Sequence, residues 1–561
     1  MSSELVKPES LIRNHKYWRA LEMVPGTLTW SAFLFVPLGS IFLPSLTANL
    51  IITYTLIWVF RTFIFSYNLV KAFHFSKRAE KTDWGLLNSL LENPKKLDYL
   101  IEKRNFHFDP MILRLRHGPL EPVLQHKIEE LKSSGQYLRP SEIIHCITIP
   151  TAKEPYEVLR TSLESYVRSN YDLKKVIILL AFEERDWPNA LNISKQLKKE
   201  FGHYFMAYLH TCHPKNLPNE LVGRAANATW AAKALKKYLL KNSIPFEKLL
   251  LSSFDADTVI SPNYLNELTF RYCISKNRNE VGFQPVPFYH NNIWEVPIFN
   301  RLVAISCSFW QLSVSLRKDE NKSFSSRAMN FQSVIDFGYW DSKVVQDDSR
   351  QYWTAFFVYQ GRHYLENIYS PVYMDAVLSG SYLDTLKSQY KQLRRWAWGV
   401  SDFPFIVLNI FKSSHIPLKK KIYESIHFLE SVFFWATGPI ILLFAGITPN
   451  LINSQFNSSI LSHNLPHIMS FLLNIASLGI LVCIFITMRI IPFKAQKSWY
   501  KKVSLFVQWI FVPVVSVVLS AIPAIDAQTR LLFNKRLDFQ VTEKKRGEVK
   551  PFSHIASTNR R

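Results

Sequence analysis

Apolar positions along this chain are concentrated towards its two ends. Near the N-terminus, two apolar runs cover residues 28–43 and 50–69, separated only by the uncharged stretch 44–49. A hydrocarbon layer about 30 Å thick is crossed by roughly 20 apolar residues in a helix, so these runs predict a transmembrane hairpin over 28–70, closed by a tight turn. Arg61 lies inside the second run. Because a charge in hydrocarbon is costly, we expect Arg61 to face protein or an aqueous path.

Two further apolar runs, 428–447 and 468–490, lie in the C-terminal part of the chain. The loop 450–467 between them contains no Lys or Arg, whereas the connection 489–502 after them carries one Arg and four Lys. Cytoplasmic loops of membrane proteins are enriched in these residues, so the loop is expected outside and the connection inside.

The last apolar run, 503–525, is long enough to span once, yet the tail 534–561 after it is as basic as the connection before it. A single span would place that tail outside. Prolines break helices, and Pro513 and Pro523 lie within the run. We therefore favour a re-entrant hairpin or two shallow arms within a C-terminal membrane region over 422–533, which returns the tail to the cytoplasm.

The N-terminal residues 1–27 are polar and basic and show no small-residue cleavage site, so the first apolar run is expected to be a retained anchor. Together these patterns predict an integral membrane protein of the plasma (inner) membrane. Its large central domain is expected in the cytoplasm.

The central residues contain no spanning run and hold most of the charge. Residues 71–140 are expected to form short amphipathic helices, and an interface helix is expected at 403–411 within a connecting region 401–421. From 141 to 400, short β-branched runs alternate with helical periods, which predicts a parallel sheet covered on both faces and binding its ligand at the carboxyl ends of the strands. The expected strands are 143–149, 176–180, 204–209 and 249–254, and the helices between them are 155–169, 189–200 and 225–241.

Composition narrows the classes of function. Apolar residues make up 48% of the chain and aromatic residues 14%, which excludes a disordered or collagen-like protein. No G-x-G-x-x-G or P-loop motif occurs, and the five cysteines show no metal spacing, which argues against zinc. The net charge of +23 suits nucleic acid, anionic lipid or phosphorylated substrates. Nucleic acid is not an expected partner, because the basic residues cluster beside the apolar runs, where membrane topology accounts for them.

Candidate chemistry begins where the fourth expected strand ends. Asp255 and Asp257 are separated by one residue, and alternate residues of an extended chain point the same way. Two such carboxylates can hold Mg²⁺ or Mn²⁺ against a diphosphate, since hard oxygen ligands suit these ions. The alternative is a solvated turn, because Asp-x-Asp is common in proteins.

Two more motifs follow, each with a plain alternative. Asp347 and Asp348 end a short apolar run, and they are either acid–base candidates or the N-cap of a helix over 349–359. The sequence Gln-Leu-Arg-Arg-Trp at 392–396 offers an amide, two guanidinium groups and an indole. Its alternative is a basic, aromatic helix at the bilayer surface.

The joint occurrence of these motifs, in this order and between membrane helices, resembles the family 2 glycosyltransferases of the cellulose synthase and hyaluronan synthase kind. The resemblance covers about residues 142–399 and the membrane layout. It implies a GT-A-like α/β nucleotide-sugar-binding domain in the cytoplasm, with transmembrane helices on its N- and C-terminal sides. It also implies an inverting hexosyltransferase that moves a sugar from a UDP-sugar to a growing polysaccharide.

On the donor side, the stretch 150–154 is similar to the family's Pro-x-x-x-Glu loop, which places Thr151 and Glu154 near the nucleotide. Arg224 and Asn227 lie in a stretch similar to the family's Lys-x-Gly-Asn segment, which meets the diphosphate. Arg224 stands in the place of the lysine, keeps its charge and adds bidentate phosphate geometry.

Around the reaction centre, Asp255 and Asp257 match the metal and nucleotide motif, with Asp257 as the more direct ligand of Mg²⁺ or Mn²⁺. Asp348 matches the last residue of the family's Thr-Glu-Asp and is implied as the catalytic base. The Gln-x-x-Arg-Trp motif, which closes over the donor diphosphate and the acceptor end, is matched by Gln392, Arg395 and Trp396.

The sequence departs from the family's pattern in three places. Glu183 follows the second expected strand, where the family usually has an Asp pair that contacts the base, so the base is less defined. Gln346 and Asp347 replace Thr-Glu, which leaves two candidate bases side by side, and the register of the motif favours Asp348. The stretch 288–327 has no cellulose-type Gly-Ser-Gly signature, so the polymer is not identified.

The expected partners are a nucleotide sugar donor, a polysaccharide or lipid-linked acceptor, and membrane lipids. Two alternative functions stay open. A non-processive transferase would add one sugar to a lipid-linked acceptor, and product size separates it from a polymerising enzyme. A catalytically inactive membrane scaffold or channel is compatible with the departures at Ala181 and Gln346, and hydrolysis of a nucleotide sugar would exclude it.

Overall fold

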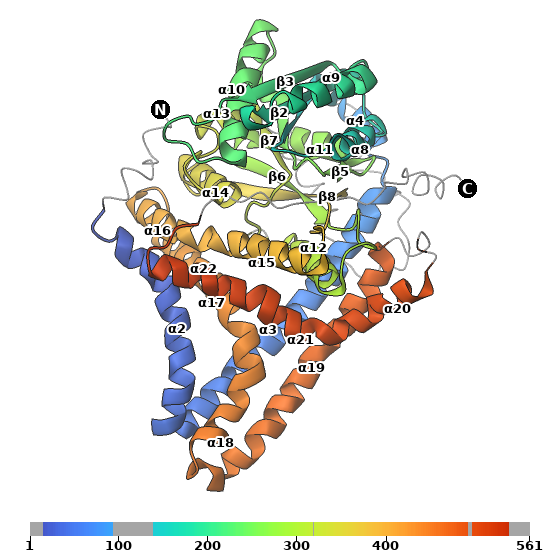
Figure 1. The fold of residues 1–561 in the computed structure, drawn as a ribbon. Helices are drawn as coiled ribbons and strands as arrows, with labels where there is room; N and C mark the ends of the chain where they lie inside the picture. The colour runs from blue at the N-terminus through green and yellow to red at the C-terminus, as the bar shows by residue number, and fades with distance from the viewer. Residues whose placement is uncertain (1–14, 94–137, 318, 492–495, 497, 538–561) are drawn as a thin grey trace.

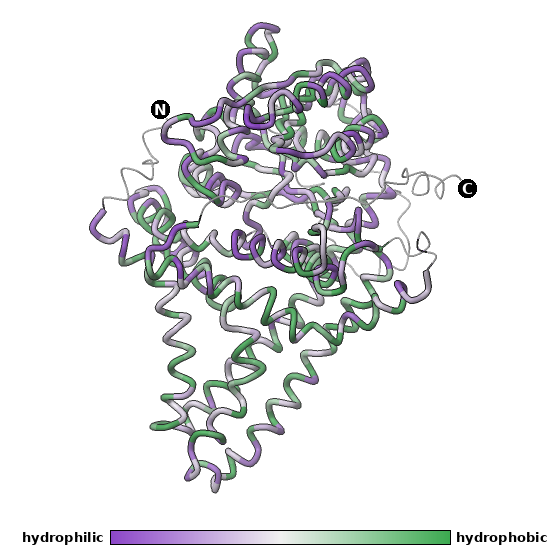
Figure 2. Tube along the Cα trace, viewed as in Figure 1, coloured by the Kyte–Doolittle hydropathy of each residue, from purple (hydrophilic) through white to green (hydrophobic). Residues whose placement is uncertain are grey.

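The computed structural model describes residues 15–93, 138–317, 319–491, 496 and 498–537. In Figure 1 an α/β domain sits over a group of long helices, with a set of shorter helices between the two. The long helices are mostly hydrophobic, whereas the outer helices of the α/β domain are mostly hydrophilic (Figure 2). Most of the helices expected in 71–140, the basic tail beyond 537 and the first fourteen residues lie outside the described part of the chain.

The α/β domain is built on an eight-stranded sheet with strand order β3-β2-β1-β4-β7-β6-β8-β5. The first four strands in this order run parallel, β7 is antiparallel to β4 and β6, and β5 is antiparallel to β8. The strands are β1 Ile144–Pro150, β2 Val176–Glu183, β3 Ala207–His213, β4 Leu249–Ser253, β5 Val259–Ile260, β6 Val281–Phe288, β7 Arg327–Asn330 and β8 Tyr364–Tyr373.

The expectation of a wholly parallel sheet is therefore wrong for its second half. The four expected strands are present as β1 to β4, but the later strands carry no clear apolar alternation. Strands β5 and β7 are short, and β6 contains Pro285 and Pro287. The expected helices between the first strands are present as α8 Tyr156–Val167, α9 Asn189–Phe201 and α10 Arg224–Lys241.

Helices cover both faces of this sheet. Along β2, Ile178 and Leu180 pack into one core with α8, α9 and α11 (Tyr264–Cys273). Ile177 and Leu179 pack into a second core with α10, α13 (Phe331–Asp336) and α14 (Asp347–Val358). Because successive residues of a strand point to opposite faces, β2 is apolar at nearly every position and buried throughout.

The N-terminal hairpin is present as α2 (Trp18–Phe42) and α3 (Pro44–Lys81), with only Leu43 between them. Residues 44–49, expected as a turn, instead begin α3, since proline is well accommodated at the first position of a helix. At 1.5 Å per residue α3 is about 57 Å long, far more than a bilayer core. Its C-terminal part packs on the α/β domain, where Phe75 joins the core.

The C-terminal spans correspond to α17 (Leu418–Phe444), α18 (Thr448–Ile452) and α19 (Ile460–Ile490). Arg61 of α3 forms an ion pair with Glu430 of α17, so its charge is compensated by protein, as expected. The stretch expected as an interface helix forms α16 (Phe403–Lys412), and most of its residues are buried, so its place at the bilayer surface stays a prediction. Counting these helices, five stretches of the described residues are long and apolar enough to cross a membrane.

The fifth stretch, which follows α19, does not run alongside the others. It is broken into α20, α21 and α22, and Leu519 before α22 has non-helical torsion angles. In Figure 1 these helices lie across the ends of the long helices and below α12 and α15. The bounds are α12 Ile298–Val314, α15 Tyr382–Ala397, α20 Trp499–Val507, α21 Val512–Ser516 and α22 Ile522–Leu532.

Side-chain contacts hold this segment against the α/β domain. Arg394 of α15 donates to Asp526 of α22 at 2.9 Å. At the other end of α22, Arg19 of α2 donates to the carbonyl oxygen of Leu531 at 2.8 Å. The end of α22 therefore lies beside the start of α2. The choice between shallow arms and a single span for 503–525 stays a prediction.

Candidate active site

Charged side chains from five elements meet at the edge of the sheet where β4 ends. This edge is formed by the carboxyl ends of the parallel strands, where α/β sheets bind their ligands. We call the set the acid–arginine cluster. Its members are Asp255 after β4, Arg224 at the start of α10, Arg327 at the start of β7, Asp347 and Asp348 in the first turn of α14, and Arg395 in the last turn of α15.

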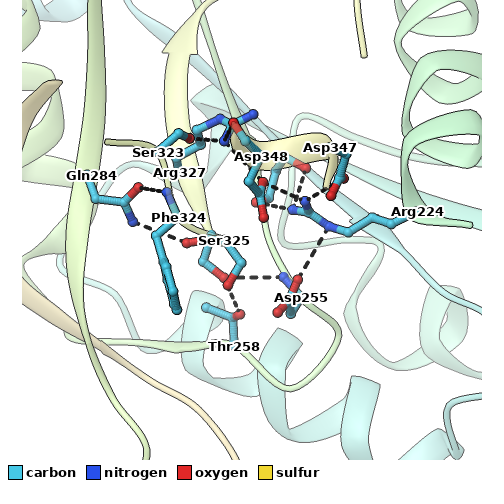
Figure 3. A network of polar contacts seen from close by, with 12 residues as sticks. Arg224, Asp255, Thr258, Gln284, Ser323, Phe324, Ser325, Arg327, Asp347 and Asp348 are labelled. Carbon is cyan, nitrogen blue, oxygen red and sulfur yellow. Dashed lines mark hydrogen bonds and ion pairs between the residues drawn. The ribbon is translucent and has the colours of Figure 1, made fainter. Parts of the chain in front are cut away.

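Arg224 lies between three carboxylates (Figure 3). Its Nη1 donates to Asp348 Oδ1 at 3.0 Å and to Asp347 Oδ2 at 3.2 Å, and its Nε lies 3.4 Å from Asp255 Oδ1. Its Nη2 donates to the carbonyl oxygen of Ser253 at 3.2 Å. Burial alone would lower the pKa of Arg224, but the three carboxylates raise it above its ordinary value. Arg224 is thus a permanent cation shared by three acids.

Arg327 is a second cation on Asp348, and the sequence did not single it out. Its Nη1 donates to Asp348 Oδ1 at 3.0 Å and to the carbonyl oxygen of Asp348 at 3.2 Å. The Arg327 side chain is only 2% exposed. In the sequence, Arg327 is a charged residue at the start of a four-residue stretch, Arg327–Asn330, and it belongs to no recognisable motif.

Arg395 of α15 interacts electrostatically with the acids of the cluster. Burial lowers the pKa of its guanidinium group, and the negative charges of Asp347, Asp255 and Asp348 oppose that shift. The expected Arg of Gln-x-x-Arg-Trp is therefore within electrostatic range of the expected acids. The preceding arginine, Arg394, instead pairs with Asp526 and anchors the helix.

Asp347 and Asp348 have pKa values that move in opposite directions. Burial raises the pKa of Asp347, and the neighbouring negative charge of Asp348 raises it further. Burial acts in the same sense on Asp348, but the guanidinium groups of Arg224 and Arg327 hold its pKa below the ordinary value. Asp348 therefore stays ionised, and Asp347 is the first of the pair to take up a proton as the pH falls.

Residues expected around the nucleotide meet at the ends of β1 and β2. Asn227 Nδ2 donates to the carbonyl oxygens of Thr151 at 3.2 Å and Ala181 at 2.6 Å. The Thr151 N–H donates to the same Ala181 oxygen at 2.8 Å. Glu154 closes its own loop, because its Oε2 accepts from the N–H of Ala152 at 2.5 Å. Asn227 and Thr151 therefore hold the two strand ends together.

A pocket opens at the ends of β2 and β3. Glu183, His213, Glu220 and Gly223 are among the residues that line it. Burial raises the pKa of Glu183, while the positive charge of Arg185 opposes the shift. Because Gly223 directly precedes the arginine of α10, this pocket adjoins the acid–arginine cluster.

Asp257, the second acid of the Asp-x-Asp motif, is less exposed than Asp255. It is buried, and its Oδ2 accepts from the N–H of Asp375 at 2.8 Å. The Asp255 side chain, by contrast, is 27% exposed. No group of three or more His, Cys, Asp or Glu side chains in the described part of the chain is arranged to hold a metal ion. A cation at this site would therefore need ligands from its substrate as well.

Gln392 and Trp396 lie one turn apart on α15. Gln392 Oε1 accepts from Gln389 Nε2 at 3.1 Å. The Trp396 ring meets the Phe324 ring edge-on, with 5.7 Å between centroids. The Gln-x-x-Arg-Trp helix therefore presents its arginine to the acids and its indole to an aromatic neighbour.

No family model matches this sequence, and no curated protein matches it. Among solved structures, it is similar to the mannosyltransferase PcManGT from Pyrobaculum calidifontis in complex with GDP-Man and Mn²⁺, with 12% identity, 74% of this chain and 95% of that chain covered, and a TM-score of 0.37. It is also similar to S. aureus TarS 1–349 in complex with UDP-GlcNAc, with 10% identity, 60% of this chain and 90% of that chain covered, and a TM-score of 0.33. A third similar structure is GalNAc-T7 with UDP, GalNAc and Mn²⁺, with 13% identity, 53% of this chain and 57% of that chain covered, and a TM-score of 0.27. These similar structures are glycosyltransferases, but TM-scores this low do not establish a shared fold.

Proposed function

We propose that this chain is a membrane-bound glycosyltransferase of the family 2 kind, which transfers a sugar with inversion from a UDP-sugar to a growing polysaccharide. One observation carries the proposal. Three carboxylates and three guanidinium groups, from elements far apart in the sequence, lie together at the ligand-binding edge of the sheet. Buried charges gathered in this way are typical of active sites.

The donor diphosphate is proposed to bind between Arg224 and Arg395. Guanidinium groups bind phosphate oxygens through charge and paired hydrogen bonds. The nucleoside would then extend towards the pocket lined by Glu183, which adjoins the start of α10. The Thr151 and Asn227 contacts would shape the floor between the two, and Glu154 would keep its loop closed.

A divalent cation, Mg²⁺ or Mn²⁺, fits this arrangement on grounds of charge. The formal charges of the cluster cancel, so a diphosphate brings a negative charge that the protein alone does not balance. Asp255 is the acid best placed to hold the cation, because its side chain is partly exposed and its contact with Arg224 is the longest of the three. The resemblance implies Asp257 as the more direct ligand, and its Oδ2 accepts from the N–H of Asp375. When bound, the ion would stabilise the charge of the departing nucleoside diphosphate.

Asp348 is proposed as the general base. An acceptor hydroxyl must lose its proton as it attacks, and a carboxylate that stays ionised can accept it. The two guanidinium groups on Asp348 keep it in that form. A base without a covalent nucleophile implies a single displacement, and therefore inversion. Trp396 would stack on the acceptor sugar, with Gln392 one turn away on the same helix.

The α/β domain is proposed to face the cytoplasm from the plasma (inner) membrane. The basic residues that follow α19 and α22 favour this orientation by the positive-inside rule. Helix α15, which carries Arg395, lies between the sheet and α22 (Figure 1), and Arg394 of α15 donates to Asp526 of α22. An acceptor polymer or lipid-linked sugar could therefore be held at the bilayer surface.

The proposal is tested with detergent-purified protein, a panel of UDP- and GDP-sugars, and Mg²⁺ or Mn²⁺. We expect one donor to release nucleoside diphosphate and enter a polymeric product. The Asp348→Asn variant should lose transfer, whereas Asp384→Asn, a matched change in the first turn of α15 outside the cluster, should keep it. No release from any donor, or a fully active Asp348→Asn protein, would refute the proposal. A product one sugar longer than its acceptor would favour the non-processive alternative.

A further inference from the structure

Four arginine side chains in the described part of the chain are buried, and one of them has no acidic partner. The other three form ion pairs with carboxylates: Arg271 with Glu267, Arg327 with Asp348, and Arg350 with Asp402. The fourth, Arg301 of α12, is 3% exposed and forms no ion pair with a carboxylate of the described residues. A buried charge without a counterion is costly, so the position of Arg301 calls for an anion.

Neutral acceptors hold Arg301 in place. Its Nε donates to Gln508 Oε1 at 2.7 Å, and its Nη2 donates to Ser504 Oγ at 2.7 Å. Burial lowers the pKa of the guanidinium group to about 10, and no neighbouring negative charge opposes that shift. Arg301 is therefore still a cation at neutral pH, and these contacts fix its direction without neutralising it.

A second buried donor lies beside this cation. Gln508 is fully buried, and its Oε1 faces Arg301 because Arg301 can only donate. The Nε2 of the same amide has no acceptor among the described residues. A buried N–H group without an acceptor also costs free energy. A guanidinium group and an amide NH2 side by side, both short of an acceptor, are suited to the oxygens of a phosphate.

Helix α20, which precedes Gln508, presents an apolar face to the outside. Its exposed apolar residues recur every three or four positions and continue into η11 (Gln508–Phe511): Trp499, Val503, Phe506, Val507 and Ile510. Lys501 and Lys502 lie in the first turn of α20. In Figure 1, α20 lies at the edge of the structure, beside the α/β domain and away from the α18 end of the long helices. An apolar face with aromatic and basic residues is typical of a helix at a bilayer interface.

We propose that Arg301 and Gln508 bind the phosphate of an anionic membrane phospholipid, whose acyl chains lie along the apolar face of α20. A soluble phosphate would satisfy the same donors, but the apolar face beside them favours a ligand that carries hydrocarbon. Lys501 and Lys502 favour an anionic headgroup over a zwitterionic one. Such a lipid would strengthen the contact between α12 and the segment beneath it. The inference goes beyond the proposed transfer reaction and does not depend on it.

The test measures phospholipid binding to the full-length protein, purified in an uncharged detergent. Dioleoylphosphatidylglycerol, dioleoylphosphatidylcholine and inorganic phosphate are titrated separately. The thermal midpoint is recorded, and the lipid retained by the protein is measured by native mass spectrometry. In wild type, phosphatidylglycerol should raise the thermal midpoint, because a ligand that binds only the folded state stabilises it. Phosphatidylcholine and inorganic phosphate should have little effect.

Two variants and a control examine the site itself. Arg301→Gln should raise the apparent dissociation constant of phosphatidylglycerol at least about tenfold, because a charge-assisted contact to phosphate is lost. Gln508→Glu should weaken phosphatidylglycerol binding as strongly, because its carboxylate supplies the missing anion beside Arg301. For the same reason it should raise the thermal midpoint in the absence of lipid. Arg489→Gln, which removes an exposed cation in the last turn of α19, is the matched control and should bind phosphatidylglycerol as wild type does.

Several results would overturn the inference. Equal responses of wild type to phosphatidylglycerol and phosphatidylcholine, or no response to either, would exclude a site for an anionic lipid. An equally strong response to inorganic phosphate would identify a soluble ligand instead. Unchanged phosphatidylglycerol binding in Arg301→Gln and Gln508→Glu would mean that Arg301 only ties α12 to η11. If Arg301→Gln fails to fold, Gln508→Glu, which keeps the arginine, decides the question.

Discussion

Arg350 of α14 and Asp402, the last residue of η7 (Trp398–Asp402), form a fully enclosed ion pair, with side-chain exposures of 1% and 0%. Arg350 Nη2 lies 2.7 Å from Asp402 Oδ1, and Arg350 Nε donates to the same oxygen at 2.8 Å. Gln346 Nε2 adds a third bond to it at 2.9 Å. Arg350 lies two positions after Asp348, the second acid of the pair. Directly after the Gln-x-x-Arg-Trp helix comes η7. The pair therefore fixes these two proposed catalytic segments relative to each other.

Removing one partner of this pair should be strongly destabilising, because the other charge is left buried without compensation. We expect Asp402→Asn to lower the free energy of unfolding by about 3–5 kcal/mol, measured as a fall in the thermal midpoint of the purified protein. The control is Arg362→Gln, which breaks an exposed pair with Glu280 and should cost less than about 1 kcal/mol. A smaller loss in the double variant Arg350→Met/Asp402→Leu would support the mechanism. Equal effects in Asp402→Asn and Arg362→Gln would contradict it.

Asp348→Asn and Asp347→Asn should separate the two candidate bases. If Asp348 is the general base, its replacement should lower kcat by about 10²–10⁴-fold, with little change in the dissociation constant of the nucleoside diphosphate. Asp347→Asn should have the milder effect on kcat. Single-turnover transfer and nucleotide binding measured on the same preparations would decide. The reverse order of effects would assign the base to Asp347.

The pH dependence of kcat/KM should report the acidic pair. The rate should fall as the pH decreases through the pKa values of the pair, because the base must be ionised. Replacing Asp347 by Asn removes a negative charge beside Asp348, which lowers the pKa of Asp348 and moves the acidic limb to lower pH. Arg327→Met removes a positive charge, which raises that pKa and moves the limb to higher pH. Limbs that coincide in all three proteins would mean that another group controls the profile.

The same shifts have opposite consequences for stability. The pKa of Asp348 is depressed in the folded protein, so it contributes stability at neutral pH that is lost as the pH falls through its unfolded and folded values. The pKa of Asp347 is raised, so its ionisation with rising pH removes stability. The change in thermal midpoint caused by Asp347→Asn should therefore be more favourable at neutral pH than at acidic pH, where Asp347 is already protonated.

Arg224 should compete with a metal ion for the three acids. In Arg224→Ala we expect tighter Mn²⁺ binding in the absence of nucleotide, because three carboxylates lose their shared cation. The same variant should bind UDP at least about tenfold more weakly, because a guanidinium contact to phosphate is lost. Mn²⁺ binding is followed by electron paramagnetic resonance and UDP binding by calorimetry. Asp255→Asn should weaken Mn²⁺ binding, and unchanged Mn²⁺ affinity in both variants would exclude a cation at this site.

The end of α22 should lie on the same side of the membrane as the α/β domain. We expect Lys535→Cys to react with a membrane-impermeant maleimide from the side that also labels Lys237→Cys on α10. Gln455→Cys, between α18 and α19, should react only from the other side. The three partly exposed native cysteines, Cys212, Cys307 and Cys483, are first replaced by serine. Labelling of Lys535→Cys together with Gln455→Cys would restore the single-span interpretation of 503–525.

Local patterns predicted the first half of the sheet well and the second half poorly. The strand around Val176–Glu183 is apolar at almost every position, so its burial on both faces could be anticipated. Arg327–Asn330 is four residues long and begins with an arginine, so nothing local marks it as a strand. It becomes a strand because β4 and β6 pair with it on both sides.

The candidate site divides in a similar way. Asp255, Asp348 and Arg395 were singled out from motifs, and they share one cluster. Arg327 was missed because its role depends on a partner 21 positions away in the sequence, which only the tertiary structure brings into contact. The register of the motif favoured Asp348 over Asp347, but the opposite pKa shifts of the two acids were out of reach, because they depend on the cations that face each carboxylate.

The sequence by itself determined the apolar helical hairpin, the first four strands with their helices, and the residue types available for chemistry. These features follow from hydrophobic periodicity and charge, which act over a few turns of chain. Only the tertiary structure decided how the sheet ends, which arginines face which acids, and how α20 to α22 lie beneath the domain. Those features depend on burial and on Coulomb interactions between segments that are distant along the chain, and neither can be evaluated until the segments have packed.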